Sequence, residues 1–232
     1  MFRQLLRRLI PTYAILPLCL TGLTNLLAYQ GAKLFQLLFG AENAVDVTSV
    51  LDSATPFEPA WVLVYIGTYL FWIYQYTRVA KESPRMACQL AVADAVAKLI
   101  CLFFFIVVPT TNVRPAVEGN GVIPFLMRAI YFLDTPTNLF PSIHCFVAYM
   151  GTRYLFACKT LRFKALTCVL CCIGTLLVFA STLLTKQHVL VDVVGGIVVS
   201  EIGWLVARFT KLPQKLEPLA QAFANTKLGK LL

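Results

Sequence analysis

Long apolar segments alternate with short polar segments along most of the chain. Each apolar segment approaches the roughly 20 residues that an α-helix needs to cross the hydrocarbon core of a bilayer. The pattern therefore predicts an all-α, polytopic membrane protein with six transmembrane helices in a single domain, residues 1–232. The expected spans cover residues 13–29, 59–76, 87–109, 141–157, 165–184 and 188–209.

The first apolar segment, residues 13–29, follows three arginines. A cleaved signal peptide is the alternative interpretation. However, the segment is long, is interrupted by Pro17 and Asn25, and lacks a clean small-residue cleavage site. We therefore expect a retained first span. A loop over residues 31–58 is expected next, with a short interfacial helix as an option at its start.

Composition supports a membrane protein. The chain is 59% hydrophobic and 13% charged, whereas soluble domains are about half apolar and a quarter charged. The net charge of +9 could indicate nucleic acid, but the lysines and arginines are spread over short loops. That distribution is typical of a membrane surface, so we predict the lipid bilayer and no nucleic acid as a partner. The eight cysteines lie almost all in apolar segments and are interpreted as small apolar filler, with no metal and no cofactor expected.

Basic residues concentrate in alternate connections. With six spans, all of these clusters lie on one side of the membrane. By the positive-inside rule that side is cytoplasmic, which predicts that both termini are cytoplasmic. The clusters are Arg3, Arg7 and Arg8; Arg78, Lys81 and Arg85; Lys159, Arg162 and Lys164; and Arg208, Lys211, Lys215, Lys227 and Lys230.

The chain contains two histidines, and each lies where a polar stretch meets an apolar segment. His188 and Asp192 are four residues apart and would share one face of a helix. A carboxylate placed in this way accepts a proton from one ring nitrogen and leaves the other as a base or nucleophile. Alone, this pair is also consistent with an ordinary polar helix end. Because His144 lies at a second such boundary, we interpret the two histidines as one site.

The predicted topology brings three segments to the non-cytoplasmic face. Arg114 follows the third span, Ser142 and His144 begin the fourth, and the stretch from Lys186 to Asp192 joins the fifth and sixth. A helix N-terminus binds phosphate readily. Two histidines with cations suit attack on phosphorus, in which cations hold phosphoryl oxygens, one histidine attacks, and the other protonates the leaving oxygen. The resulting phosphohistidine would be hydrolysed or passed to another acceptor.

A second polar cluster is expected nearer the cytoplasmic side. Asp94, Lys98, Arg153 and Glu201 would lie roughly 18–24 Å from the outer face at about 1.5 Å per residue. We predict that they form one buried, roughly neutral network that joins the third, fourth and sixth spans. A proton or ion relay is the alternative, since intramembrane charges are often functional.

Three motifs occur in a characteristic order. They are Arg114-Pro115, then Pro141-Ser142-Ile143-His144, then Ser181-Thr182 followed after five residues by His188 and then by Asp192. In this the chain resembles the type 2 phosphatidic acid phosphatase superfamily, which groups lipid phosphate phosphatases with vanadium haloperoxidases. The resemblance implies that His188 is the nucleophile, Asp192 its orienting partner and His144 the general acid. It also implies that Arg114 and the Ser142 hydroxyl bind the phosphate, and that residues 134–138 shape the pocket.

Two positions depart from the pattern of that superfamily. Val107 stands where it usually has a lysine, and Thr182 where it usually has an arginine. We expect Lys186 or Arg128 to supply a replacement cation, with Thr182 still beside the phosphate. The Thr-Lys-Gln-His stretch that ends at His188 resembles the branch that includes inositol phosphorylceramide synthases.

The expected function is therefore a metal-independent membrane phosphatase. Its substrate would be a lipid phosphate or polyprenyl diphosphate, and its active site would lie on the non-cytoplasmic face of the cell membrane. One alternative is a lipid head-group phosphotransferase that uses the same histidines. The other is a transporter or scaffold whose polar cluster binds a lipid head group without chemistry. No oligomeric state is predicted.

Overall fold

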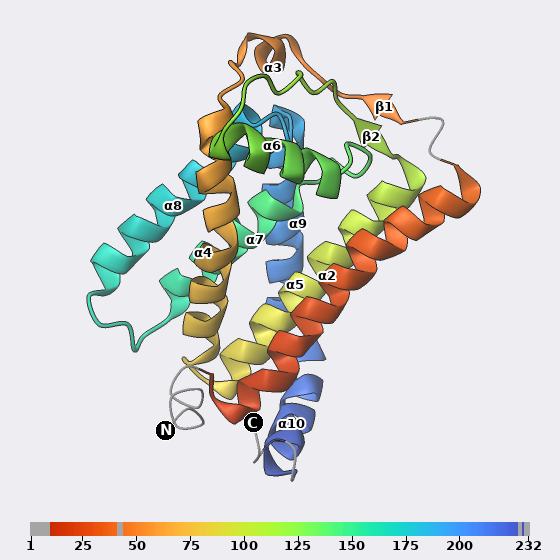
Figure 1. The fold of residues 1–232 in the computed structure, drawn as a ribbon. Coiled ribbons are helices and arrows are strands. Elements are labelled where there is room, and N and C mark those ends of the chain that lie inside the picture. Colours follow the sequence, from red (N-terminus) through yellow and green to blue (C-terminus); the bar gives the residue numbers. More distant parts are fainter. Residues whose placement is uncertain (1–9, 41–43, 227–228, 230–232) are drawn as a thin grey trace.

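The long helices of the molecule pack side by side in one bundle (Figure 1). The computed structural model describes residues 10–40, 44–226 and 229. Apart from one pair of two-residue strands, the regular structure of these residues is helical, which confirms the all-α prediction for them. The main helices are α2 (Thr12–Phe39), α4 (Val62–Ala80), α5 (Pro84–Val107), α7 (Ile143–Ala157), α8 (Lys164–Leu184) and α9 (Leu190–Phe209).

Apolar helices of membrane-spanning length make up much of the bundle. In the described part of the chain, α2, α5, α8 and α9 are long and apolar enough to cross a membrane. These helices indicate an integral membrane protein. The other two expected spans are also helices, but α4 carries Gln75 and Arg78 among several tyrosines, and α7 is 15 residues long. The count of six spans and the orientation of the termini stay predictions.

The first helix is longer than predicted. Residues 31–39, expected to begin a loop, are instead the last turns of α2. Ala32 is fully buried there, and the Gln36 side chain donates a hydrogen bond of 3.1 Å to the carbonyl of Phe105 on α5. The helix ends at Gly40, whose φ of 85° is a conformation that glycine adopts without strain. Packing against α5 therefore extends the helix beyond its apolar stretch.

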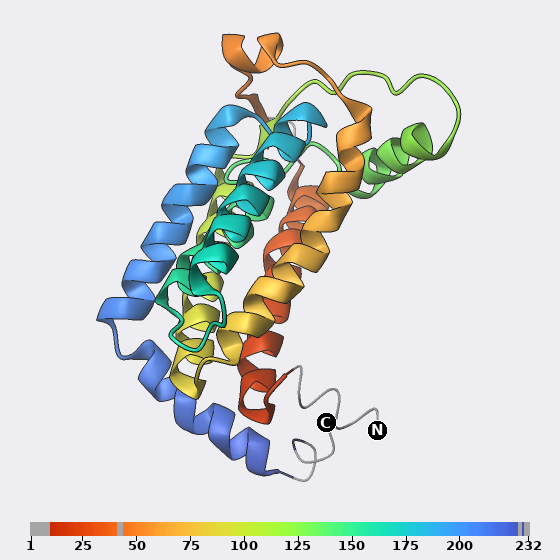
Figure 2. The same cartoon turned by 90° about the vertical axis from the view of Figure 1, so that its left-hand side faces the viewer.

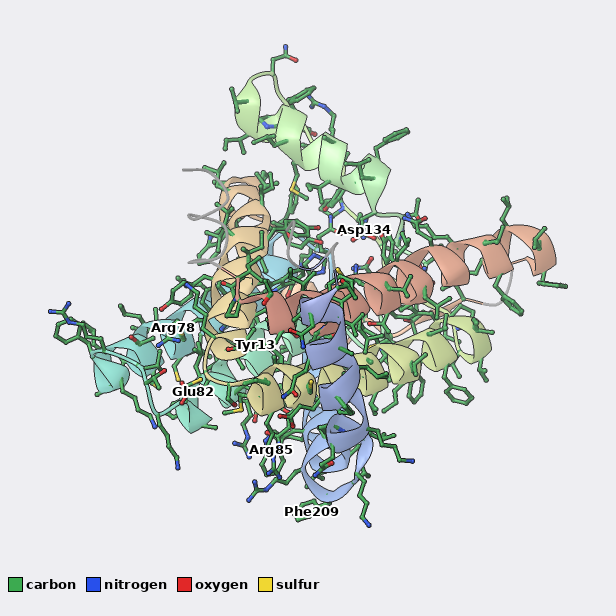
Figure 3. The ribbon with its side chains drawn as sticks, turned by 90° about the horizontal axis from the view of Figure 1, so that it is seen from below. Tyr13, Arg78, Glu82, Arg85, Asp134 and Phe209 are labelled. Carbon is green, nitrogen blue, oxygen red and sulfur yellow. The ribbon has the colours of Figure 1, made fainter. Side chains whose placement is uncertain are left out.

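The two ends of the bundle differ in structure. The histidine end carries the longer connections: β1 (Val45–Asp46), α3 (Val50–Ala54), the 3-10 turn η1 (Pro59–Trp61), β2 (Thr110–Thr111) and α6 (Val122–Leu133). β1 pairs with β2 in parallel. Figure 2 and Figure 3 both show α6 extending away from the bundle. It exposes Val122, Phe125 and Phe132 by 65–83% and buries only Met127 fully, so it is an amphipathic surface helix.

The opposite end, which we call the basic end, holds shorter connections and α10 (Leu212–Asn225), which runs across it (Figure 2). Figure 3 looks at this end and labels Arg78, Glu82 and Arg85. Glu82 accepts a hydrogen bond of 2.7 Å from the backbone N–H of Lys159, and Arg78 donates one of 3.1 Å to the Thr160 carbonyl. Some charged residues named in the sequence or its loops lie outside the described residues: Arg3, Arg7, Arg8, Lys227 and Lys230 of the basic clusters, and Glu42 of the loop after the first span.

The predicted four-residue network is wrong, because its members form two separate ion pairs. Lys98 Nζ lies 2.7 Å from Asp94 Oδ2, and both side chains are almost fully buried. Lys98 also donates a hydrogen bond of 2.8 Å to the Thr21 carbonyl, and Tyr76 donates one of 2.6 Å to Asp94. This pair therefore connects α5 with α2 and α4, rather than with the fourth and sixth expected spans.

The second ion pair does connect those two spans. Arg153 Nε on α7 lies 3.3 Å from Glu201 Oε1 on α9, and the two side chains are 34% and 35% exposed. Tyr149 donates a hydrogen bond of 2.7 Å to the same carboxylate. The contact between Arg153 and a carboxylate of this cluster was predicted correctly, but its partial exposure was not.

Candidate active site

His188 is held at the turn between α8 and α9. The helix α9 begins at Leu190, and the carboxylate of Asp192 accepts a hydrogen bond of 3.0 Å from the backbone N–H of Val189. The same carboxylate lies 3.2 Å from His188 Nδ1, and both side chains are buried. The predicted contact between His188 and Asp192 is confirmed. Because Nδ1 is engaged, Nε2 is the ring nitrogen left for chemistry.

The start of α7 brings His144 against this turn. Ser142 is the N-cap of α7, and its hydroxyl accepts a hydrogen bond of 3.2 Å from the Cys145 N–H. Its own N–H donates one of 3.1 Å to the Asp192 carbonyl, so the two helix N-termini dock directly. Gly196 permits this approach, since a Cβ there would lie 2.8 Å from the Ser142 carbonyl. The ring centres of His144 and His188 are 5.9 Å apart, as expected for one site.

Aromatic side chains of α4 surround His144. The ring centre of His144 lies 4.6 Å from that of Tyr65, 5.1 Å from Trp72 and 6.0 Å from Tyr69. Sequence reasoning missed this contribution, although the spacing of the aromatic residues places them on one face of a helix. They hold the imidazole within an apolar, π-rich environment.

A cavity of about 310 Å³ lies in front of both histidines. The hydroxyl of Tyr29 donates a hydrogen bond to the carboxylate of Asp134, and that of Tyr65 lies 3.4 Å from its other oxygen. Residues 134–138 were expected to shape the pocket, and two of them line it. The lining includes Tyr29 from α2, Tyr65 and Trp72 from α4, Asp134 and Asn138 from the connection before α7, and both histidines.

Arg114 lies beside the turn that carries His188. Its guanidinium donates one hydrogen bond to the Asp134 carbonyl and another, of 2.8 Å, to Gln187 Oε1. It also lies 4.8 Å from the ring centre of Tyr131. Burial lowers the pKa of Arg114 below its ordinary value, and the negative charge of Asp134 opposes that effect. The geometry places the cation next to the residue that precedes His188.

Lys186 lies on the other side of the turn. Its amino group donates hydrogen bonds of 2.7 and 2.6 Å to the carbonyls of Asp52 and Thr55. The carboxylate of Asp52 accepts one of 2.7 Å from the Leu190 N–H at the start of α9. Burial raises the pKa of Asp52, but its hydrogen bonds outweigh burial and hold that pKa below its ordinary value. Residues 52–55 are thus hydrogen-bonded to the turn that carries His188, a contact that sequence reasoning missed.

A second cavity, of about 760 Å³, lies under this segment. Lys186 and Asp52 line it, together with hydroxyl residues of the same connection. His188 lines both cavities. The His188 imidazole therefore lies between the first cavity, which aromatic residues line, and the second cavity, which is lined by more polar side chains. Lys186 lines the second cavity.

The remaining predicted phosphate ligands have other contacts. Thr182 is fully buried, and its hydroxyl donates a hydrogen bond of 2.8 Å to the Phe179 carbonyl. Arg128 is exposed and donates hydrogen bonds of 3.1 Å to the carbonyls of Val117 and Gly119. The structure therefore gathers His144, His188 and Asp192, places Arg114 beside them, and gives the other candidates other partners. The binding roles of Ser142, Thr182, Lys186 and Arg128 stay predictions.

Several buried donors around the histidines have no hydrogen-bond partner. Buried polar groups in proteins are nearly always paired, so an unpaired group calls for an explanation. Together with the helix N-terminus of α7, these donors suit an oxyanion. Within the described residues they are Trp72 Nε1, Arg114 Nε, Asn138 Nδ2, Gln187 Nε2 and, in the tautomer that carries a proton there, His144 Nε2.

Comparison with known proteins gives one similarity. The family model of the PAP2 superfamily matches residues 118–215, somewhat less than half of the 232-residue chain. The matched segment contains the Pro-Ser-Ile-His motif and the stretch from Ser181 to Asp192, while Arg114 lies just before it. The match supports phosphatase-type chemistry in general. No curated protein and no solved structure matches the chain.

Proposed function

We propose that this protein is a metal-independent membrane phosphatase that hydrolyses a lipid phosphate or a polyprenyl diphosphate. The observation that carries the proposal is the pair of imidazoles, with ring centres 5.9 Å apart on one cavity. One of them is backed by the buried carboxylate of Asp192. A nucleophile and an acid on a shared cavity, with one nitrogen fixed by a third group, is the arrangement that covalent phosphoryl transfer requires.

The reaction would proceed in two steps. In the first, His188 Nε2 attacks phosphorus, the bond to the leaving oxygen breaks, and His144 gives that oxygen a proton. In the second, His144 takes a proton from water, the resulting hydroxide attacks the phosphohistidine, and phosphate leaves with His188 restored. Asp192 stabilises the charge that develops on the His188 ring, and Arg114 offsets the charge on the phosphoryl oxygens.

The proposal includes a location in the cell. We place six spans in the membrane, with both termini cytoplasmic and the histidine end on the non-cytoplasmic face of the cell membrane. The clustering of basic residues at the opposite end supports this orientation. The apolar surface of α6 supports the placement of the histidine end at a membrane interface, since an amphipathic helix suits an interface on either face.

One observation favours a second candidate, a lipid head-group phosphotransferase. The cavity has few cations, because Lys186 and Arg128 donate to backbone carbonyls elsewhere. A phosphodiester carries less negative charge than a phosphate monoester and needs less neutralisation. Such a donor would leave the same phosphohistidine, which an alcohol rather than water would then attack.

Phosphate release from a panel of lipid phosphates and diphosphates tests the proposal. Detergent-purified protein with excess chelator should release phosphate, and vanadate should inhibit it. The substitution His188→Ala should lower the rate at least about 10³-fold, and His144→Ala about 10²- to 10⁴-fold. Tyr149→Phe, in the middle of α7 and outside the lining of the cavity, should retain activity as a control. Turnover in His188→Ala equal to wild type would contradict the proposal, and product formed only with added alcohol would favour transfer.

A further inference from the structure

Asn138 lies on the wall of the cavity that holds the two histidines. Its side chain is almost fully buried, with 6% of its surface exposed. The carbonyl oxygen Oδ1 accepts a hydrogen bond of 2.5 Å from Gln36 Nε2. The amide nitrogen Nδ2 is buried and has no partner within the described residues. One end of the amide is therefore fixed, and the other end is a buried donor without a partner, on a residue that lines the cavity.

Gln36 determines which end of the Asn138 amide faces the cavity. Its Nε2 also donates to the carbonyls of Phe105 and Thr137, at 3.1 and 3.3 Å. The two hydrogens of this nitrogen are shared among three nearby oxygens, and a group surrounded by oxygens in this way faces the oxygen of the Asn138 amide rather than its nitrogen. The orientation of Asn138 thus follows from its contacts, and Nδ2 is directed away from Gln36.

The position of this amide pair in the fold is informative. Gln36 contacts α5 at Phe105, two residues before Val107. Val107 stands where the resembled superfamily usually has a lysine. The Val107 side chain is 57% exposed and does not face the buried amide pair, so the amides are a separate feature of the cavity wall. An amide N–H donates to an oxyanion as a lysine does, but adds no charge.

We propose that Asn138 donates a hydrogen bond to a phosphoryl oxygen of the substrate. Gln36 is then a positioning residue that orients the amide. This inference rests on the proposed function, because it names a further ligand of the same phosphoryl group. It also accounts for a buried donor that would otherwise have no acceptor.

The purely structural alternative is that Asn138 only ties its connection to α2. The substitution Asn138→Asp separates the two roles. An aspartate keeps an oxygen for Gln36, so the tie remains, but it replaces the free donor with an acceptor and a negative charge. Asn25→Asp is the matched control, because Asn25 lines the same cavity from α2 and is exposed.

Vanadate binding to the full-length protein in detergent measures the proposed contact without requiring turnover. Protection against thermal unfolding gives the dissociation constant for each variant. Asn138→Ala should weaken vanadate binding about 10- to 100-fold, as for a hydrogen bond to a charged group. Asn138→Asp should weaken it further, Gln36→Ala less than Asn138→Ala, and Asn25→Asp by less than about threefold. In the absence of vanadate, the buried carboxylate should lower the melting temperature of Asn138→Asp, so its vanadate affinity is measured at a temperature where the variant is fully folded.

Wild-type vanadate affinity in Asn138→Asp would overturn the inference. Equal losses in Asn138→Asp and Asn25→Asp would also overturn it, because they would indicate only a general charge effect. The inference and the proposed function fail in different ways. If His188→Ala still turns over while Asn138→Asp loses vanadate, the oxyanion contact holds and the phosphohistidine mechanism does not.

Discussion

The two halves of the bundle place ionisable groups in apolar surroundings in opposite ways. In the half nearer the basic end, Asp94 pairs with Lys98, and Arg153 pairs with Glu201. Each charge there has an opposite charge within 3.3 Å. Such pairs hold helices together and leave no charge for a ligand.

The half nearer the histidine end keeps donors without partners. Arg114, Asn138, His144 and Gln187 each have a buried nitrogen that bonds to nothing in the described part of the protein. An unpaired buried donor is costly, and it persists where a ligand completes it. The comparison teaches that the charges of the basic half are paired with each other, whereas the histidine end keeps several buried nitrogens available to a ligand.

The largest effect on stability should come from breaking the fully buried pair. Lys98→Met leaves Asp94 without its cation, and removing one partner of a buried pair typically costs about 3–5 kcal/mol. Unfolding in detergent should show this loss, while vanadate affinity stays within about threefold of wild type. Loss of vanadate binding with unchanged stability would instead indicate that the pair belongs to an ion relay.

Arg153→Met is the matched control for that variant. Because both partners are about one-third exposed, water already screens the pair. The expected loss is therefore roughly 0.2–1 kcal/mol. Equal losses for the two variants would remove the distinction between the buried and the exposed pair.

The next effect should follow removal of the Lys186 amino group. Lys186→Met loses two charged hydrogen bonds to the connection that carries Asp52 and Thr55. Each such bond contributes about 1.5–3 kcal/mol at most, so we expect a loss of roughly 2 kcal/mol and faster proteolysis of that connection. A loss of vanadate affinity larger than that of Asn138→Ala, with wild-type stability, would show that Lys186 holds the phosphoryl group instead.

The smallest effect should come from Arg128→Ala. This exposed side chain bonds only to the carbonyls of Val117 and Gly119 on its own connection. A surface change of this kind stays within about 0.5 kcal/mol, and phosphate release should remain within about twofold of wild type. A tenfold rise in KM would mean that Arg128 reaches the substrate after all.

The positions of the helices and the meeting of the histidines could be predicted from the sequence. Apolar length identifies a helix whatever it packs against, and a spacing of four residues places His188 and Asp192 on one face. The alternation of spans then brings His144 to the same end of the bundle. These inferences depend only on local periodicity and on the direction of each helix.

The contacts of the candidate cations could not be predicted in this way. The direction of the Lys186 side chain depends on the left-handed backbone of Lys186 itself, which has a φ of 53°. It also depends on the fold of the connection that carries Asp52, more than 100 residues earlier in the chain. The extension of α2 to Phe39, and with it the contact between Gln36 and Asn138, depends on packing against α5. Neither leaves a periodic signal in the chain. The aromatic residues Tyr65, Tyr69 and Trp72 of α4 do follow a helical spacing in the sequence, but that spacing was interpreted only as part of a membrane span.

The most direct test of the account is to locate the covalent intermediate. Purified protein is mixed with the most active member of the lipid panel, labelled at its phosphorus, quenched within milliseconds and mapped by peptide. We predict an acid-labile label on His188 in wild type and no label in His188→Ala. A label on His144, on another residue, or on protein that lacks His188 would contradict it.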